Sequence, residues 1–311
     1  MTPSVGVVIP TRGDRPGPLA AALSGVLGQE YGGRVEVVVV VDGEADVAGV
    51  TRSITPAGTP GSMGSTGSAG DVLVIPNHRT PGLPGARNTG IAALGTDLVA
   101  FCDDDDVWLP GKLAAQVAAL AEEPSASFAS CAIEVQYGSR RVPRLAGTTR
   151  ITRERLTTSR MMMVHSSTFL FRRGSLWVDE SAPGGQNEDW DLALRAARPH
   201  PIVHVDRPLT RVHWGGSHYV SRWADRIAGL EWMMARHPEL AADPRGAARI
   251  FGQLAFSHAA LGHRREAARW SLRAFVARHA EPRAAVALAV ATRLVSAGVV
   301  MNALHTRGRG I

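Results

Sequence analysis

The chain has 311 residues, of which 45% are hydrophobic and 20% charged, a composition typical of a globular protein with a sizeable core. The formal net charge is +6, but the basic residues form no long tract, so we expect no nucleic-acid partner. The charge remains compatible with an anionic membrane surface or a phosphorylated ligand. Cys102 and Cys131 show neither metal spacing nor a disulfide framework, which favours buried thiols in a reducing compartment. No secretory signal is visible, so a cytoplasmic location is expected.

The first half of the chain alternates between strand and helix patterns. Short apolar runs predict buried strands at residues 5–10, 35–41, 71–75 and 96–100, and helix patterns lie at 19–27, 44–54, 86–94 and 112–121. This alternation predicts an α/β fold with a mostly parallel sheet and right-handed crossovers. Residues 55–70 are rich in Gly, Ser, Thr and Pro, which indicates a flexible surface insertion.

The second half begins less regularly and ends in Ala-rich helices. Strands are predicted at residues 128–135, 166–172, 202–205 and 209–214, and helices at 151–163 and 186–195. The shift to helical composition near Tyr219 predicts two parts, residues 1–218 and 219–311. Residues 254–270 resemble a single tetratricopeptide-like helix pair, which is no repeat array. Apolar residues 284–304 are interrupted by Arg293, which favours a packed helix over a membrane span or an interfacial anchor.

Four consecutive aspartates, residues 103–106, follow the predicted strand that ends near Phe101. Pro110 can open the next helix at its first turn. Because adjacent carboxylates repel one another, they are tolerated in full solvent or around a cation. Oxygen ligands suit a hard ion such as Mn²⁺ or Mg²⁺. The alternative is a solvated acidic turn that stabilises the N-terminus of the helix.

Other polar residues fall at the ends of the neighbouring strands. Thr11 and Arg12 follow the first strand, Asp42 the second, and Arg87 opens a helix just before the acidic strand. In a parallel sheet these positions meet at one edge, where open α/β folds bind ligands. Taken singly, Asp42 also fits a turn and Arg87 a surface charge. The chain has neither a P-loop nor a G-x-G-x-x-G fingerprint, which excludes the common nucleotide-binding alternatives.

Five segments in order resemble glycosyltransferase family 2, whose fold is GT-A, a Rossmann-like sheet flanked by helices. The matching segments are residues 7–11 (VVIPT), 38–43 (VVVVDG), 85–91 (GARNTGI), 103–113 (DDDDVWLPGKL) and 187–195 (NEDWDLALR). The resemblance spans roughly residues 4–215 and leaves an α-helical C-terminal extension outside it. The chain departs from the family after the second strand, where Asp42-Gly43-Glu44 replaces two acidic residues followed by Gly-Ser.

The resemblance implies a role for each matching position. The positions that hold the nucleotide sugar are Pro10, Thr11, Arg12, Asp42, Arg87 and Asp104, the last of them near the ribose. Asp103 and Asp105 match the D-x-D motif that binds Mn²⁺ or Mg²⁺, and His213 lies where a histidine reaches the metal or the diphosphate. Asp189 matches the catalytic base, with Glu188 beside it.

These residue types fit an inverting glycosyl transfer. A carboxylate deprotonates the acceptor hydroxyl while the metal stabilises the departing nucleoside diphosphate. Without the resemblance, Asp189 also fits the stabilisation of a helix N-terminus, and His213 a neutral histidine beside Trp214. Trp190 and Trp214 are expected in the core rather than as stacking faces for a sugar.

The resemblance therefore indicates a metal-dependent, inverting glycosyltransferase that uses a nucleotide-diphosphate sugar and an unidentified acceptor. Two alternatives are a non-catalytic nucleotide-sugar-binding scaffold with a helical interaction tail, and a sugar nucleotidyltransferase. The latter usually has a Gly-rich basic signature near the first strand, which residues 11–15 match poorly. Peripheral contact with the inner face of the membrane and a homodimer through the helical tail are further expectations.

Overall fold

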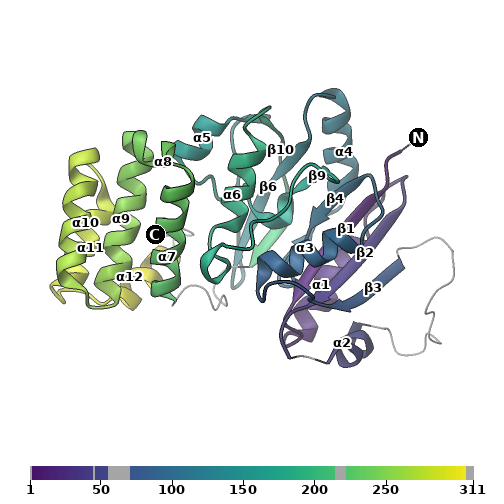
Figure 1. The fold of residues 1–311 in the computed structure, drawn as a ribbon, viewed down its shortest axis with the longest axis horizontal. Coiled ribbons are helices and arrows are strands. Elements are labelled where there is room, and N and C mark those ends of the chain that lie inside the picture. The colour runs from purple at the N-terminus through teal and green to yellow at the C-terminus, as the bar shows by residue number, and fades with distance from the viewer. Residues whose placement is uncertain (1, 45, 55–70, 214–221, 306–311) are drawn as a thin grey trace.

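A computed structural model describes residues 2–44, 46–54, 71–213 and 222–305 (Figure 1). The predicted insertion at residues 55–70 and the predicted core residue Trp214 lie outside these ranges. The described residues form a layered α/β sheet domain with a block of helices packed at one end of it.

Strands and helices alternate through the first 101 residues, as the apolar pattern predicts, and a second short strand then precedes the next helix. The strands are β1 (Val5–Thr11), β2 (Val35–Val41), β3 (Asp71–Pro76), β4 (Leu98–Phe101), β5 (Val107–Trp108), β6 (Phe128–Tyr137), β7 (Arg140–Arg144), β8 (Arg150–Ile151), β9 (Leu170–Arg172) and β10 (Ile202–His213). The helices among them are α1 (Pro16–Leu27), α2 (Val47–Ile54), α3 (Leu83–Ala93), α4 (Lys112–Glu122), α5 (Arg153–Thr158) and α6 (Glu188–Ala196), with short 3₁₀ turns η1 (Ser166–Thr168) and η2 (Pro183–Gly185).

One sheet holds these strands in the order β3-β2-β1-β4-β9-β6-β10-β5, with β7 on β6 and β8 on β10. The first four are parallel neighbours, and β9 joins them to the rest by antiparallel pairing on both sides. In the parallel part, Thr11 lies opposite Val41 and Val8 opposite Phe101. The residues that follow β1, β2 and β4 therefore emerge together at one edge.

Helices cover both faces of the sheet because alternate strand residues point to opposite sides. On one face, Val7 and Ile9 of β1 pack with side chains of α1, α2 and α4. On the other, Val8 packs with α3 and α6. Close packing on this second face needs Gly90 of α3, where an added Cβ would lie 2.3 Å from the side chain of Val8. Both cysteines are buried thiols, as the sequence predicts.

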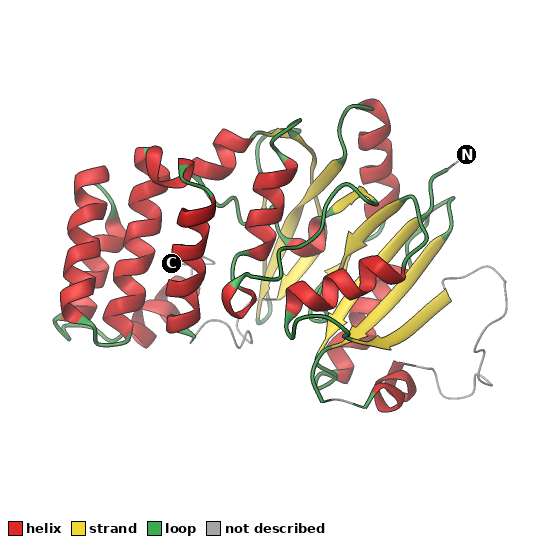
Figure 2. Cartoon of the chain, in the orientation of Figure 1, coloured by secondary structure: helices red, strands yellow, loops and turns green. Residues whose placement is uncertain are grey.

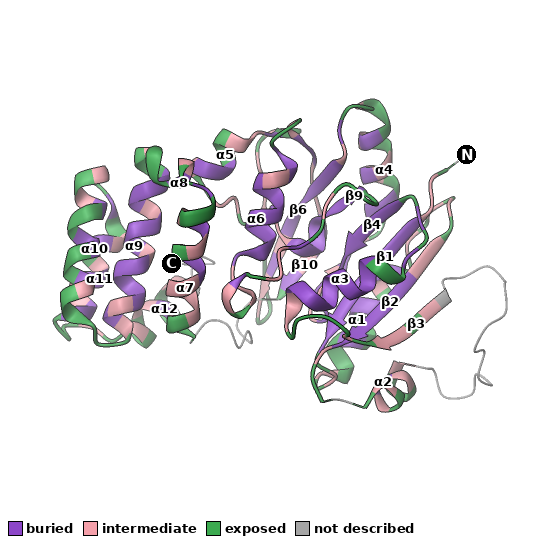
Figure 3. Cartoon of the chain, in the orientation of Figure 1, coloured by how far each residue is buried: buried purple, intermediate pink, exposed green. Residues whose placement is uncertain are grey.

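The described residues of the C-terminal part form six helices at one end of the sheet (Figure 2). They are α7 (Trp223–Arg236), α8 (Glu239–Ala242), α9 (Pro244–Ala260), α10 (Arg264–Ala277), α11 (Pro282–Ala291) and α12 (Ala297–His305). The expected helix pair corresponds to α9 and α10, which pack side by side. Their inner surfaces are buried while the outer surface of α10 is exposed (Figure 3).

The helical part shares a core with the sheet. Trp190 and Leu194 of α6 belong to the same buried cluster as Leu230 and Met233 of α7 and Phe256 of α9. The indole of Trp190 donates to the carbonyl of Leu156 at 3.1 Å, so Trp190 is a core residue, as expected.

Several predicted segments differ from the structure. The helix predicted at residues 151–163 is only α5, because Ser159 is extended and Met161 has a φ of 40°; hydroxyl and β-branched residues at 157–159 are weak helix formers. The two strands predicted at 202–205 and 209–214 are one strand, β10. A register shift around Pro208 lets β10 continue along β6 although proline cannot donate to the ladder.

Residues 166–172, predicted as one strand, begin as the 3₁₀ turn η1 and become strand only at Leu170.

Among the described residues, none of the helices combines the length and apolar character needed to cross a bilayer.

Candidate active site

The edge formed by the ends of β1, β2 and β4 carries most of the predicted site. The backbone N–H of Asp42 donates to the carbonyl of Thr11 at 2.8 Å, and that of Cys102 to Val8 at 3.1 Å. Pro10 and Thr11 are buried in β1, whereas Arg12 is exposed at its end. The parallel register thus brings together residues separated by about 90 positions in the chain, as the sequence predicts.

Asp104 lies beneath this edge and is bound from two sides. The hydroxyl of Thr11 donates to Asp104 Oδ2 at 2.6 Å, and Arg15 donates to Oδ1. Burial raises the pKa of Asp104 to about 6, with Asp105 and Asp103 adding to the effect and Thr11 and Arg15 opposing it. A carboxyl with this pKa is still mostly ionised at neutral pH, so Asp104 acts as an acceptor for Thr11 and Arg15.

Asp42 organises the loop that enters α3. Its carboxylate accepts from the side-chain amide of Asn77 at 2.7 Å and from the backbone N–H of Gly82 at 3.0 and 3.1 Å. Asn77 in turn accepts from the hydroxyl of Thr89 at 2.7 Å. Asp42 is therefore more than a turn residue, because it fixes the start of the helix that carries Arg87.

Arg87 is fully buried and links the two halves of the site. It donates to Asp103 Oδ1 at 2.6 Å and to a carboxylate oxygen of Glu188. Its alternative assignment as a surface charge is wrong, since 1% of the residue is exposed. Burial works against the charge of Arg87, but Asp103 and Glu188 outweigh it and raise its pKa above the ordinary value.

The pKa values of the two carboxylates that Arg87 joins are shifted in opposite directions. Burial raises the pKa of Glu188 to about 7, assisted by Asp189 and opposed by Arg87. Burial also acts to raise the pKa of Asp103, but Arg87, His165 and Ser166 outweigh it and lower that pKa. Asp103 is accordingly the more firmly ionised of the two.

Asp106 lies deepest in the acidic run and is 2% exposed. The hydroxyl of Ser167 donates to its Oδ2 at 2.6 Å, and His165 Nδ1 lies 3.5 Å from the same oxygen. Asp103, Asp106 and His165 offer ligand atoms within 4.8 Å of one another, a group that could hold a metal ion. Burial, with Asp103 and Asp105 adding to it, raises the pKa of Asp106 well above its usual range.

Asp105 and His213 meet on the solvent side of the run. The side chain of Asp105 is 34% exposed and accepts from Arg15 at 2.6 Å. The Nδ1 of His213 lies 2.7 Å from the backbone carbonyl of Asp105. Because a carbonyl only accepts, Nδ1 carries the proton and Nε2 keeps its lone pair for an electrophile. His213 is exposed, and Trp214, beside which the alternative interpretation places it, lies outside the described residues.

Asp189 stands in the first turn of α6, close to Glu188. Arg160 donates to both of its oxygens at 3.0 and 3.2 Å, and the N–H of Trp190 donates at 2.7 Å. Burial acts to raise the pKa of Asp189, but Arg160, His165 and Arg87 outweigh it and lower that pKa. The result is a buried carboxylate that stays ionised.

The partners of the predicted residues were not foreseen from the sequence. The additional side chains are Arg15, Asn77, Arg160, His165, Ser166 and Ser167. The hydroxyl of Ser166 donates to Asp103 Oδ2 at 2.8 Å, and the N–H of Asp103 donates to Ser167 Oγ at 2.9 Å. The sequence did contain one sign of the contacts made by His165, Ser166 and Ser167. The polar run His-Ser-Ser-Thr at residues 165–168 overlaps the start of the strand predicted at 166–172 and does not fit an apolar strand.

Glycosyl transferase family 2 matches residues 6–178, which is more than half of the chain. The chain belongs to this family. The match covers β1 through β9 and includes the acidic run and Arg87. This family 2 protein is therefore a glycosyltransferase, and the expected α/β fold of the GT-A type is confirmed.

Solved glycosyltransferases show the same fold over almost the whole chain. TarS of S. aureus, residues 1–349 with UDP-GlcNAc, has a TM-score of 0.57 at 13% identity over 94% of this chain and 91% of its own. The mannosyltransferase PcManGT of Pyrobaculum calidifontis, with GDP-Man and Mn²⁺, has a TM-score of 0.53 at 19% identity over 97% and 79%. No curated protein matches the sequence.

Proposed function

We propose that this protein is a metal-dependent, inverting glycosyltransferase that uses a nucleotide-diphosphate sugar. The observation that supports this most strongly is the position of Arg87 between Asp103 and Glu188. This link holds the predicted donor end and the predicted base, Asp189, in one site. TarS and PcManGT, which share the fold, carry UDP-GlcNAc and GDP-Man, and these are the donor classes to test first.

The donor side is formed by the strand ends. Pro10, Thr11, Arg12 and Asp42 frame the nucleoside, and Asp104 reaches the ribose. Arg15, which already pairs with Asp104 and Asp105, has a guanidinium fork suited to a phosphate. When the donor binds, we expect Arg15 to leave one of these two carboxylates and to pair with the diphosphate instead.

We place the divalent cation on the solvent side of the acidic run. Asp103, Asp105 and Nε2 of His213 are the proposed ligands, because the side chain of Asp105 is 34% exposed and His213 is exposed, whereas Asp106 is nearly inaccessible. The hydrogen bond from His213 Nδ1 to a backbone carbonyl orients the ring as is usual for metal ligands. Bound Mn²⁺ or Mg²⁺ would neutralise charge that develops on the departing diphosphate.

Asp189 performs the proton transfer. It accepts the proton of the acceptor hydroxyl while that oxygen forms a bond to the anomeric carbon from one face. The bond from the anomeric carbon to the diphosphate oxygen breaks on the opposite face, and the nucleoside diphosphate leaves with the electron pair. The configuration at the anomeric carbon is therefore inverted. Glu188 supports Asp189 by keeping Arg87 in place.

The division into a catalytic part, residues 1–218, and a helical part, residues 219–311, belongs to this proposal. Leu272 and Val276, one turn apart on α10, are exposed by 65% and 74%. These apolar side chains support a homodimer or a peripheral membrane contact through the helical part.

A panel of UDP- and GDP-sugars tests the proposal, with thermal stability measured with and without Mn²⁺. A donor that binds the native state raises the melting temperature by mass action. Turnover is then followed as release of the nucleoside diphosphate, which EDTA should abolish. Release of pyrophosphate would point to a nucleotidyltransferase, and donor binding without turnover to a scaffold.

A further inference from the structure

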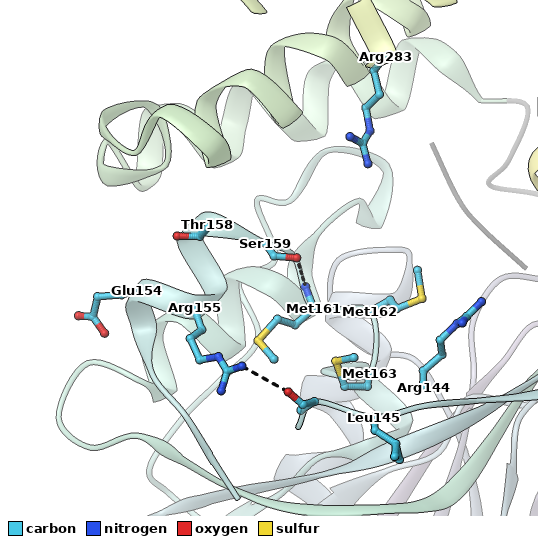
Figure 4. Close-up of a pocket in the computed structure, with 11 residues that line it drawn as sticks. Arg144, Leu145, Glu154, Arg155, Thr158, Ser159, Met161, Met162, Met163 and Arg283 are labelled. Atoms are coloured by element: carbon cyan, nitrogen blue, oxygen red, sulfur yellow. Dashed lines mark hydrogen bonds between the residues drawn. The ribbon is translucent and has the colours of Figure 1, made fainter. Parts of the chain in front are cut away.

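A cavity lies between the sheet domain and the C-terminal helices. Its volume is about 710 Å³, and its wall includes Arg144, Arg155, Arg283 and the three methionines at 161–163. Figure 4 shows Arg283 reaching in from the helical side, while Arg144, Arg155 and the methionines lie on the opposite side, with Arg155 turned toward the carbonyl of Ala146. Three arginines and a single acidic residue, Glu154, line this space.

Two arginines of the cavity keep hydrogen-bond donors for a further acceptor. Arg155 is exposed and donates to the carbonyl of Ala146 at 3.3 Å. Arg283 pairs through Nη1 with Glu281 at 2.7 Å, while its Nε is buried without a hydrogen-bond acceptor among the described residues. Each of the two guanidinium groups can therefore donate to an incoming anion without losing these contacts.

More positive charge stands next to the cavity. Arg249 of α9 lies over the ring of Trp190, 4.9 Å from its centre, and its Nε and Nη2 are buried with no acceptor in the described part of the chain. Arg160 and Arg283 both repel it, and Glu281 is the acidic group that acts on it. Hydrogen-bond donors that are buried without an acceptor raise the free energy of the folded state, and so do like charges that lie close together. A bound anion would reduce both contributions.

This arginine cluster reaches the catalytic carboxylate. Ser159 and Met161 line the cavity, and Arg160 between them donates to Asp189. Arg160 therefore connects the segment that forms part of the cavity wall to Asp189. This arrangement suits an acceptor that places a hydroxyl at Asp189 and a charged group in the cavity.

We propose that the cavity binds oxyanions of the acceptor, phosphate or carboxylate groups, at Arg155 and at Arg283, with Arg249 next to Arg283. The inference rests on the proposed glycosyl transfer and names the class of acceptor that the site takes. Arginine forks bind both oxyanions through paired charge-assisted hydrogen bonds. The methionines supply an adaptable apolar wall for the part of the acceptor next to the anion. The helices α9 and α11 thus contribute to the acceptor site.

The test uses the full chain without donor or divalent metal, so its outcome does not depend on the proposed reaction. Inorganic phosphate and succinate are the probes, with chloride at equal ionic strength as the reference. Binding is read from the rise in melting temperature with probe concentration. The variants are Arg283→Gln and Arg155→Gln, and Arg155 is the safer one for folding because it is exposed.

Two matched variants control for charge and for the donor site. Arg265→Gln removes an exposed arginine of α10 that does not line the cavity. Arg15→Gln weakens the binding of any phosphate that occupies the donor end instead of the cavity. We expect each cavity variant to weaken oxyanion binding by about tenfold or more, and Arg265→Gln to bind like the wild type. Arg15→Gln should leave the oxyanion binding that depends on Arg155 and Arg283 unchanged.

Three results would overturn the proposal. The first is stabilisation by phosphate and succinate no greater than by chloride. The second is undiminished binding in both cavity variants. The third is loss of binding in Arg15→Gln alone, which assigns the anion to the donor end. Tighter binding of succinate than of phosphate would support a carboxylate acceptor, and the reverse a phosphate ester.

Discussion

Arg160 donates hydrogen bonds to both carboxylate oxygens of Asp189, at 3.0 and 3.2 Å. The pair joins the segment after α5 to the first turn of α6. It places a buried, ionised carboxylate at the junction of the sheet domain and the helical part. The proposed base is thereby both oriented and kept unprotonated.

Replacing Asp189 by asparagine separates chemistry from donor binding. Asp189→Asn keeps the size of the side chain but cannot accept the acceptor's proton, so turnover should fall by about 10²–10⁴-fold. Donor affinity with Mn²⁺ should change by only a few-fold, because no proposed donor contact is altered. Steady-state rates and donor titrations check this. Normal turnover would place the base elsewhere, with Glu188 the first candidate.

Arg160 should control the acidic limb of the pH profile. Burial acts to raise the pKa of Asp189, and Arg160 is the first of the charges that lower it. Arg160→Gln removes that charge, so the pKa of Asp189 should rise and activity should be lost at a higher pH than in the wild type. Because the pKa of Asp189 in the wild type lies below the ordinary value, rates are measured from as low a pH as the folded protein tolerates up to pH 8. An unchanged acidic limb would show that Asp189 is not the titrating base.

Arg87 should be a large contributor to stability. Arg87→Met leaves Asp103 and Glu188 without their buried partner, which should lower the free energy of unfolding by about 3–5 kcal/mol. Arg34→Met is the matched control, because Arg34 is 68% exposed in its ion pair with Glu36; its loss should cost less than about 1 kcal/mol. Denaturant titration measures both. Equal losses in the two variants would contradict the bridging role of Arg87.

The metal ligands can be distinguished by two substitutions. Asp105→Asn should abolish Mn²⁺-dependent donor binding and turnover, whereas His165→Gln should retain Mn²⁺ binding within a few-fold. Calorimetric titration of the metal-free protein with Mn²⁺ measures both. The opposite result would assign the ion to the deeper group of Asp103, Asp106 and His165. Full wild-type activity in EDTA would remove the metal from the mechanism.

Asp191 should make the protein sensitive to acid. Its buried carboxylate accepts from Arg195 at 2.8 Å, Arg236 at 2.6 Å and His237 at 2.9 Å. Burial alone would raise its pKa, but His237, Arg195 and Arg236 lower it to about 2. The folded state therefore gains stability from this group above about pH 4, the pKa of an unfolded aspartate.

The ionised Asp191 carboxylate contributes about 2 kcal/mol to the free energy of unfolding, and this contribution should disappear as the pH falls from about 4 to about 2. Asp191→Asn should flatten the stability profile in this range. Thermal unfolding between pH 2 and 6 compares the two proteins. Parallel profiles would mean that Asp191 does not carry the acid sensitivity.

The amino-acid sequence alone determined the layered α/β fold and the edge on which the site lies. Apolar runs such as residues 35–41 form buried strands, and parallel strands bring their carboxyl ends to one edge. The order of strands and helices along the chain therefore sufficed to place Thr11, Asp42 and Asp104 together. The family match and the shared fold of solved glycosyltransferases support the same reading.

Only the tertiary structure decided which charges meet. Arg87 and Glu188 are 101 positions apart, and Arg160 and Asp189 come from different elements. Local propensities carry no information about such pairs, because their free energy arises from mutual burial after the chain has folded. Contacts of the same kind explain why η1 replaces the start of a predicted strand. The hydroxyl of Ser166 donates to Asp103 and that of Ser167 to Asp106, and in each pair the two residues are more than 60 positions apart in the sequence.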